Sequence, residues 1–270
     1  MSLKRSPGSE IVCILILFVL LKKFTAKKNT TPQNQNFYSC LQGLEMANPG
    51  GWVVAVDGPA ASGKGTLSKR LASALNFAYL DTGSLYRATA LRVLRCQGSA
   101  ALDNVCLQSA AEAALAITVE DLADQNLRSE LVGQCASIVS EDPNTRSALL
   151  QFQRSFCHSP PNGLRGAVLD GRDIGTVVCP GALVKLFVTA DVDTRAARRY
   201  SELCAAGTST SLDRVKQDME QRDLRDLSRA TAPLCAARDA LEIDSTCLSE
   251  DEVFAAAMAH VRNKLPGVFC

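Results

Sequence analysis

The sequence predicts an α/β fold in which a five-stranded parallel sheet lies between helices. Three observations lead to this class. Short runs of strand-forming apolar residues alternate with longer stretches of helix formers, the first run is apolar throughout, and a glycine-rich turn follows it. Strands interleaved with helices are joined by right-handed crossovers into a parallel sheet that is buried on both faces. With 270 residues, 47% of them hydrophobic, the chain can bury one large core with a small insert.

The expected strands are short, and helix signals lie between them. The sequence predicts a helix over Thr66–Leu75, after the glycine-rich turn, and a last helix that opens with the capping box Ser249–Glu252 and ends near Lys264. A further strand-like run stands at Ala116–Val119. The five strands are expected at Trp52–Val56, Phe77–Leu80, Ala167–Leu169, Val184–Val188 and Ala240–Ile243.

Charge and cysteine content exclude several classes of function. The net charge of +1 gives no electrostatic basis for binding nucleic acid. The 11 cysteines are odd in number, form no pair with two residues between them, and mostly stand beside apolar residues. We therefore expect small thiols that fill the core in a reducing compartment, rather than disulfides or a zinc site.

Residues 1–49 form a leader that differs in composition from residues 50–270. The leader contains an apolar run, Ile11–Leu21, between basic residues, followed by a polar linker. A run of this length is too short to span a bilayer comfortably but fits a targeting segment. Two interpretations stay open: residues 1–45 target or anchor the protein, with membrane contact only through residues 11–21, or Met46 is the true start.

The strongest local motif follows the first expected strand and opens a helix, which is the context of a phosphate-binding P-loop. Glycines turn successive backbone N–H groups towards phosphates, and the helix N-terminus adds partial positive charge. Gly65 stands where most P-loops have Ser or Thr, and Thr66 follows it. This order argues against GTPases and motor ATPases and is typical of nucleoside monophosphate kinases. The expected ATP-binding residues are Gly58, Pro59, Ala60, Ala61, Ser62, Gly63, Lys64, Gly65 and Thr66.

Four segments in order, Asp57–Thr66, Leu80–Arg87, Asp170–Val178 and Arg222–Arg229, resemble bacterial-type cytidylate kinases from about Val53 to the C-terminus. The resemblance implies the P-loop nucleoside monophosphate kinase fold and ATP-dependent phosphorylation of CMP and dCMP in pyrimidine nucleotide metabolism. It also implies an acceptor-binding insert at about 103–160, a lid at about 195–232, a monomer and a cytoplasmic kinase domain. Over residues 103–126 this chain is shorter and less β-rich than the family's usual insert.

Phosphoryl transfer requires positioning and positive charge around the transferred group. Arginines follow the second, third and fourth expected strands and recur at positions 222, 225 and 229, which share one face of a helix expected from Gln217 to Arg229. Alone, such a charged helix is typical of a solvated surface. Beside the other motifs it indicates a lid, and the expected catalytic residues are Lys64, Arg172, Arg195, Arg199 and Arg222.

Substrate contacts are carried over by the resemblance. It implies that Thr82 and Arg87 bind the acceptor phosphate, that Arg222 and Asp226 face its phosphate and sugar, and that Ser137, Arg146 and Asp173 read the base. Cytosine presents an amino donor where uracil presents a carbonyl, so Asp173 is expected to disfavour UMP. Tyr86 is expected to fill the core. The full substrate set is Asp81, Thr82, Arg87, Ser137, Arg146, Arg172, Asp173, Arg222, Asp226 and Arg229.

Mg²⁺ is the expected cofactor, held mainly by phosphate oxygens and water. Thr66 and Asp170 are its candidate ligands, directly or through water, with Asp57 behind them. One alternative is another P-loop kinase acting on UMP, AMP or an alcohol such as shikimate. Another is a membrane-tethered nucleotide-binding protein that has lost catalysis. The presence of Lys64, Arg172 and Arg222 argues against this alternative.

Overall fold

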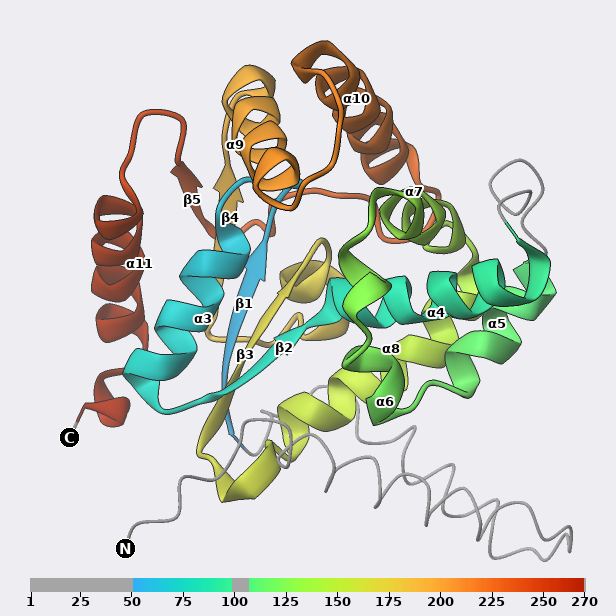
Figure 1. Ribbon diagram of the computed structural model, residues 1–270. Coiled ribbons are helices and arrows are strands. Elements are labelled where there is room, and N and C mark those ends of the chain that lie inside the picture. Colours follow the sequence, from blue (N-terminus) through green and yellow to red (C-terminus); the bar gives the residue numbers. More distant parts are fainter. Residues whose placement is uncertain (1–50, 99–106, 270) are drawn as a thin grey trace, which may run out of the picture.

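The computed structural model describes residues 51–98 and 107–269 (Figure 1). The predicted leader, its apolar run and residues 103–106 of the predicted insert lie outside these ranges. Within the described ranges, none of the helices is long and apolar enough to cross a bilayer.

Five parallel strands form one sheet in the order β2-β3-β1-β4-β5, which confirms the predicted fold class. Each strand begins and ends within two residues of its expected position. At the carboxyl edge, Asp57 of β1 is level with Gly171 of β3, and Asp81 of β2 is level with Asp170. The strands are β1 (Trp52–Asp57), β2 (Ala78–Asp81), β3 (Gly166–Gly171), β4 (Val184–Thr189) and β5 (Leu241–Asp244).

Helices cover both faces of the sheet because alternate residues of its buried strands point to opposite sides. Val54 and Val56 of β1 belong to a core shared with α3 (Lys64–Leu75) and α11 (Glu250–Lys264). Val53 and Ala55 pack on the opposite side, against α8 (Pro143–His158) and the short helix η4 (Ile174–Val178). The capping box of the last helix is present as predicted. Short helices η3 (Pro161–Gly163) and η5 (Pro266–Val268) follow α8 and α11.

In its described part, the segment between β2 and β3 consists of helices joined by turns and contains no strand (Figure 1). The strand expected at Ala116–Val119 is wrong, because this stretch is a turn into a short helix. The carboxylate of Asp121 accepts hydrogen bonds from the Thr118 backbone N–H at 2.7 Å and from Arg92 Nε at 2.9 Å, which closes that turn and overrides the β-branched residues. Besides α8, the helices are α4 (Thr82–Gln97), α5 (Leu107–Leu115), α6 (Val119–Leu122), η2 (Gln125–Arg128) and α7 (Glu130–Val139).

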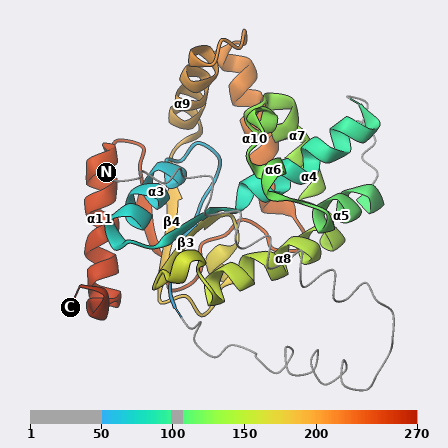
Figure 2. The ribbon, with the colours of Figure 1, turned by 60° about the horizontal axis from the view of Figure 1, so that its bottom comes forward.

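Two helices, α9 (Val192–Ala205) and α10 (Leu212–Ser228), project together from one end of the molecule in both ribbon views (Figures 1 and 2). Met219 of α10 packs with Ala196 and Leu203 of α9 in a small core of their own. This pair corresponds to the predicted lid. The second helix starts earlier than expected and ends at Ser228, because Arg229 leaves the helical conformation.

The seven described cysteines are free thiols, as expected, but their placement differs from the prediction. Cys135, Cys157 and Cys179 are buried, whereas Cys96, Cys204, Cys235 and Cys247 are exposed. The expectation of core-filling thiols is therefore wrong for four of them. For Cys96 and Cys204, apolar neighbours in the sequence did not reveal exposure, because the neighbour of a buried residue on an amphipathic helix often faces solvent. Cys235 and Cys247 lie outside the helices and strands.

Candidate active site

The P-loop follows the carboxyl end of β1, and the backbone conformation of the loop requires glycine at two positions. Gly58 has φ 150°, and a Cβ atom there would lie 2.0 Å from the carbonyl oxygen of Val188 on β4. Gly63 has φ 86° and caps α3. The helix therefore starts at Lys64, two residues before the expected Thr66, and its free backbone N–H groups face the loop.

Lys64 lies between the loop and the end of β3. Its Nζ atom is 3.6 Å from Asp170 Oδ1 and donates to the Pro59 carbonyl oxygen at 3.4 Å. Burial and, next, the nearby Arg172 lower the pKa of Lys64 to about 8, although Asp170 opposes this shift. An anionic ligand at this ammonium group would restore its ordinary pKa, so the loop is prepared for phosphate.

Asp170 explains the unusual glycine after Lys64. A Cβ atom at Gly65 would lie 3.1 Å from Asp170 Oδ2, so a serine or threonine there would crowd this carboxylate. The Tyr79 hydroxyl donates to the same oxygen at 3.4 Å. Burial raises the pKa of Asp170, and Lys64 opposes the rise, so a bound cation would favour the ionised form.

The surroundings of Asp170 fit a cation held mainly by other ligands. Among the described residues, no group of three or more His, Cys, Asp or Glu side chains is placed to hold a metal. Thr66, the other predicted ligand, is exposed at the start of α3. Asp57 is committed elsewhere, since its two oxygens accept backbone N–H groups of Ile174 at 2.8 Å and Gly175 at 2.7 Å. Asp57 therefore fixes the chain after β3.

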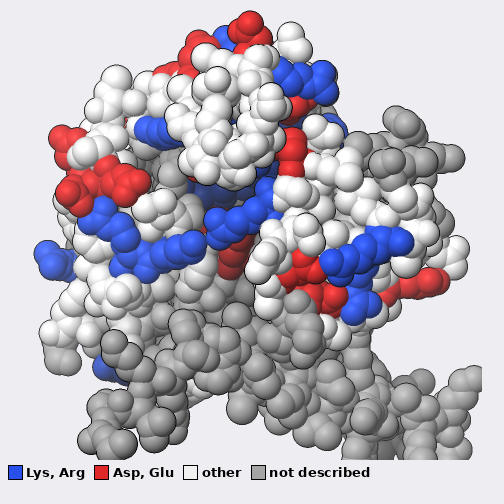
Figure 3. All heavy atoms as spheres, viewed as in Figure 1, with Lys and Arg blue, Asp and Glu red and all other residues white. Residues whose placement is uncertain are grey.

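A pocket of about 470 Å³, including its opening to solvent, lies between the sheet edge, the insert and α10. It brings together nine of the ten predicted substrate-binding residues, with only Asp81 outside. Figure 3 shows basic side chains gathered in the hollow at the centre of this face. The pocket is lined by Thr82, Gly83, Tyr86, Arg87, Ala136, Ser137, Ser140, Arg146, Gly171, Arg172, Asp173, Arg222, Asp226 and Arg229.

One end of the pocket is formed by an ion pair and a free hydroxyl. Arg146 and Asp173 are 8% and 6% exposed and form a direct ion pair, and Arg146 also donates to the Ser140 carbonyl oxygen at 3.3 Å. The buried Ser137 hydroxyl has no hydrogen-bond partner among the described residues. An unsatisfied hydroxyl beside a paired guanidinium and carboxylate is arranged for a planar ligand that offers donors and acceptors.

Tyr86 was expected to fill the core, and it does pack there, but its ring also lines the pocket. The Arg146 guanidinium lies 5.7 Å from the centre of that ring. Gly83, Ala136, Ser140 and Gly171 also line the pocket and were missed. They contribute shape or backbone rather than a distinctive side chain, so the sequence carries no signal for them.

The other end of the pocket is an arginine cluster around Asp226, which is 1% exposed. Its carboxylate accepts from Arg172 Nε at 2.8 Å and is also paired with Arg229. Arg222 has a buried Nε atom with no hydrogen-bond partner in the described part of the chain. Burial and, next, Arg172 lower the pKa of Arg222 to about 9. The cluster therefore holds more positive charge than Asp226 neutralises, as an anion site requires.

Three predicted residues near β2 have distinct surroundings. Thr82 lines the pocket and donates its hydroxyl to the Asp170 carbonyl oxygen at 2.7 Å. Arg87 lines the pocket and donates to the Leu127 carbonyl oxygen at 2.8 Å. Asp81 instead caps α4 by accepting from the Ser84 N–H at 3.3 Å, so its contact with substrate stays a prediction.

The arginines of the predicted lid do not share one surface. Arg195 donates to Ala60 of the P-loop at 3.4 Å and pairs with Asp223 at 2.7 Å, while Arg199 pairs with carboxylates on two helices. Neither lines the pocket, so their catalytic roles stay predictions. The expectation that Arg222, Arg225 and Arg229 share one helix face is wrong. Arg225 donates back to the Gln221 carbonyl oxygen, and Arg229 lies past the end of α10.

Over most of its length the chain is similar to known cytidylate kinases. The family model described as cytidylate kinase matches residues 54–263. The chain is 50% identical over 212 residues to a cytidylate kinase of Paramagnetospirillum magneticum, which covers 78% of this chain and 98% of that protein. It is 48% identical to the enzyme of Rhodospirillum rubrum, with the same coverage. The enzyme of Azorhizobium caulinodans is 47% identical and covers 77% of this chain and 97% of its own.

Proposed function

Because the chain belongs to the cytidylate kinase family, we propose that it transfers the γ-phosphoryl group of ATP to CMP and dCMP, yielding CDP and dCDP for pyrimidine nucleotide metabolism. The observation that carries this proposal is the pocket with two unlike ends. A buried guanidinium–carboxylate pair with a free hydroxyl lies at one end, and an undercompensated arginine cluster lies at the other. A nucleoside monophosphate has this polarity, with a planar base at one end and a dianion at the other.

The base is read by Ser137, Arg146 and Asp173. Because Arg146 is always protonated, it donates to the cytosine acceptors, while Asp173 accepts from the N4 amino group and Ser137 serves either. Uracil would place a carbonyl oxygen against the Asp173 carboxylate. A buried polar group left without a partner makes the binding free energy less favourable, so UMP is expected to be the poorer acceptor.

The phosphate end positions the acceptor for attack. Arg87, Arg172 and Arg222 bind the acceptor phosphate, with Asp226 and Arg229 fixing their orientation and reaching the sugar. Lys64 and the P-loop amides hold the donor phosphates, and Arg195 and Arg199 approach them from the lid. These groups spread positive charge over the transferred phosphoryl group while the lid excludes water.

Mg²⁺ is the proposed cofactor, with Asp170 and Thr66 holding it directly or through water. When bound, it would neutralise the charge of the donor phosphates. The proposed domain organisation is a kinase domain at residues 50–270, with the acceptor-binding insert at about 103–160 and the lid at about 195–232. The enzyme is proposed to act as a monomer in the cytoplasm.

The proposal is tested with an ADP-release assay on the full chain, comparing CMP, dCMP, UMP, AMP and shikimate with Mg-ATP. We expect CMP and dCMP to give kcat/KM values at least about 10-fold above that of UMP, which is the discrimination that one unpaired buried polar group supports. Comparable turnover of UMP contradicts the base-reading argument. Turnover of AMP or shikimate in place of CMP favours the alternative kinase, and no turnover by ATP-binding protein favours the non-catalytic alternative.

Replacing Ser137 tests the base end separately. We expect Ser137→Ala to raise the KM for CMP about 10-fold, since one hydrogen bond to the base is lost, with the KM for ATP unchanged. Ser68→Ala is the matched control, because Ser68 is equally buried and unpartnered but belongs to α3, outside the pocket. Equal effects of the two substitutions on the KM for CMP would exclude a specific role for Ser137.

A further inference from the structure

Glu130, the first residue of α7, connects the predicted insert to the predicted lid. Its Oε2 atom accepts a hydrogen bond from Arg199 Nη2 of α9 at 3.0 Å. Among the ion pairs of residues 51–98 and 107–269, this one alone joins the insert to the lid. The other ion pairs of these segments lie within one of them or join one of them to the core.

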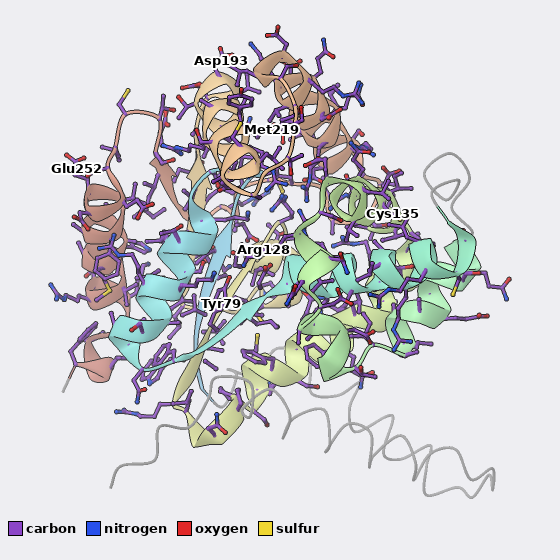
Figure 4. The ribbon with its side chains drawn as sticks, in the orientation of Figure 1. Tyr79, Arg128, Cys135, Asp193, Met219 and Glu252 are labelled. Carbon is purple, nitrogen blue, oxygen red and sulfur yellow. The ribbon has the colours of Figure 1, made fainter. Side chains whose placement is uncertain are left out.

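Glu130 also faces the groups that are proposed to bind phosphate. Its negative charge raises the pKa of Arg87 and of Arg222, against the stronger opposing effects of burial and of other arginines. The Glu130 carboxylate therefore pairs with Arg199 of α9 and lies within electrostatic reach of Arg87 of α4 and Arg222 of α10. Figure 4 shows neighbouring Arg128 near the centre of the view, between the sheet and the helices of the insert.

The turn before α7 is held by the acceptor-binding machinery itself. Arg87 Nη1 donates to the carbonyl oxygens of Leu127 at 2.8 Å and of Ser129 at 3.5 Å, directly before Glu130. An acceptor phosphate that fixes the Arg87 guanidinium therefore also fixes the position of Glu130. Glu130 in turn orients Arg199, which is predicted to contact the donor phosphates.

We propose that Glu130 is a positioning residue that couples acceptor binding to lid closure over the donor nucleotide. Acceptor bound at Arg87 holds the start of α7, Glu130 then holds Arg199, and the lid closes more tightly over ATP. The inference rests on the proposed kinase function but adds a residue to it. Coupling of this kind is reciprocal, so ATP must tighten CMP binding by the same factor.

The coupling is measured as the ratio of dissociation constants for a non-hydrolysable ATP analogue without and with saturating CMP, using the full chain and Mg²⁺. We expect Glu130→Gln to reduce this ratio about fivefold, the range of one partly exposed ion pair, and to leave the affinity for the analogue alone unchanged. In turnover, kcat with CMP should fall about threefold, with little change in the KM for ATP.

Glu202→Gln is the matched control. Glu202 binds the same guanidinium at 3.2 Å but lies on the same helix, so its loss breaks no link across the cleft. We expect wild-type coupling in this variant. The proposal is overturned if CMP does not strengthen binding of the ATP analogue in the wild type. It is also overturned if Glu130→Gln keeps the wild-type ratio of dissociation constants, or if both variants reduce this ratio equally. Failure of the proposed function is a separate result, seen as absence of CMP phosphorylation by the wild type.

Discussion

Lys64→Met is expected to lower kcat for CMP phosphorylation about 1000-fold, because methionine keeps the length of the side chain but removes a preorganised charge beside the transferred group. In the structure the ammonium group lies between the P-loop and Asp170. The buried Asp170 would also lose its nearest cation. We therefore expect impaired transfer together with weaker binding of ATP.

The measurement is steady-state kinetics with CMP and Mg-ATP, with titration of an ATP analogue for affinity. Lys69→Met is the control, since Lys69 lies one turn further along α3 and is exposed. Activity of this control should stay within about twofold of wild type, as expected for a surface substitution. A Lys64→Met variant with kcat within about 10-fold of wild type would contradict the proposed role of Lys64.

The same lysine predicts a pH dependence of the free enzyme. Burial lowers the pKa of Lys64 from 10.5 to about 8, so below pH 8 the side chain is charged and above it the neutral form accumulates. We expect kcat/KM for ATP to fall as pH rises through about 8, because this parameter reports groups of the free enzyme. The fall in kcat should occur at higher pH, since bound phosphates favour the charged form.

The sequence predicted β1, β3 and β4 well because these strands are buried almost throughout and read as continuous apolar runs. The edge strands β2 and β5 were also placed within one residue, although β2 alternates between buried and half-buried residues and only Ile243 of β5 is buried. Nine of the ten residues predicted to bind substrate meet in the pocket, since each stands in a motif at a strand end or on a helix that faces it. These motifs are recognisable because phosphate and base recognition restrict both residue type and spacing.

Other features depended on contacts that spacing does not reveal. Ala116–Val119 has strand-forming residues, but a hydrogen-bonded turn through Asp121 decides its conformation. Gly65 is explained only by the carboxylate of Asp170, which is distant in the sequence. Arg195 and Arg199 were expected at the reacting phosphates, whereas the structure shows which carboxylates hold them. Partners of long charged side chains are set by tertiary packing, not by helical periodicity.

Arg222→Met is expected to lower kcat/KM for CMP about 100-fold without lowering the thermal unfolding temperature. The guanidinium has an unpartnered buried Nε atom, and burial and Arg172 lower its pKa to about 9. Asp226 and Glu130 oppose this shift only in part, so the charge costs stability in the empty enzyme and a bound anion would compensate it further. Residues retained for function at a cost in stability behave in this way.

Arg172→Met provides the contrast, because Arg172 pairs with the almost fully buried Asp226 at 2.8 Å. Removing Arg172 takes away one of the two ion-pair partners of this buried carboxylate and leaves only Arg229, so this variant should lose activity and also unfold about 5 °C lower. Kinetics and thermal unfolding of both variants are measured together. If Arg222→Met unfolds as early as Arg172→Met, Arg222 has a structural role, and the excess positive charge of the cluster is not what binds the acceptor phosphate.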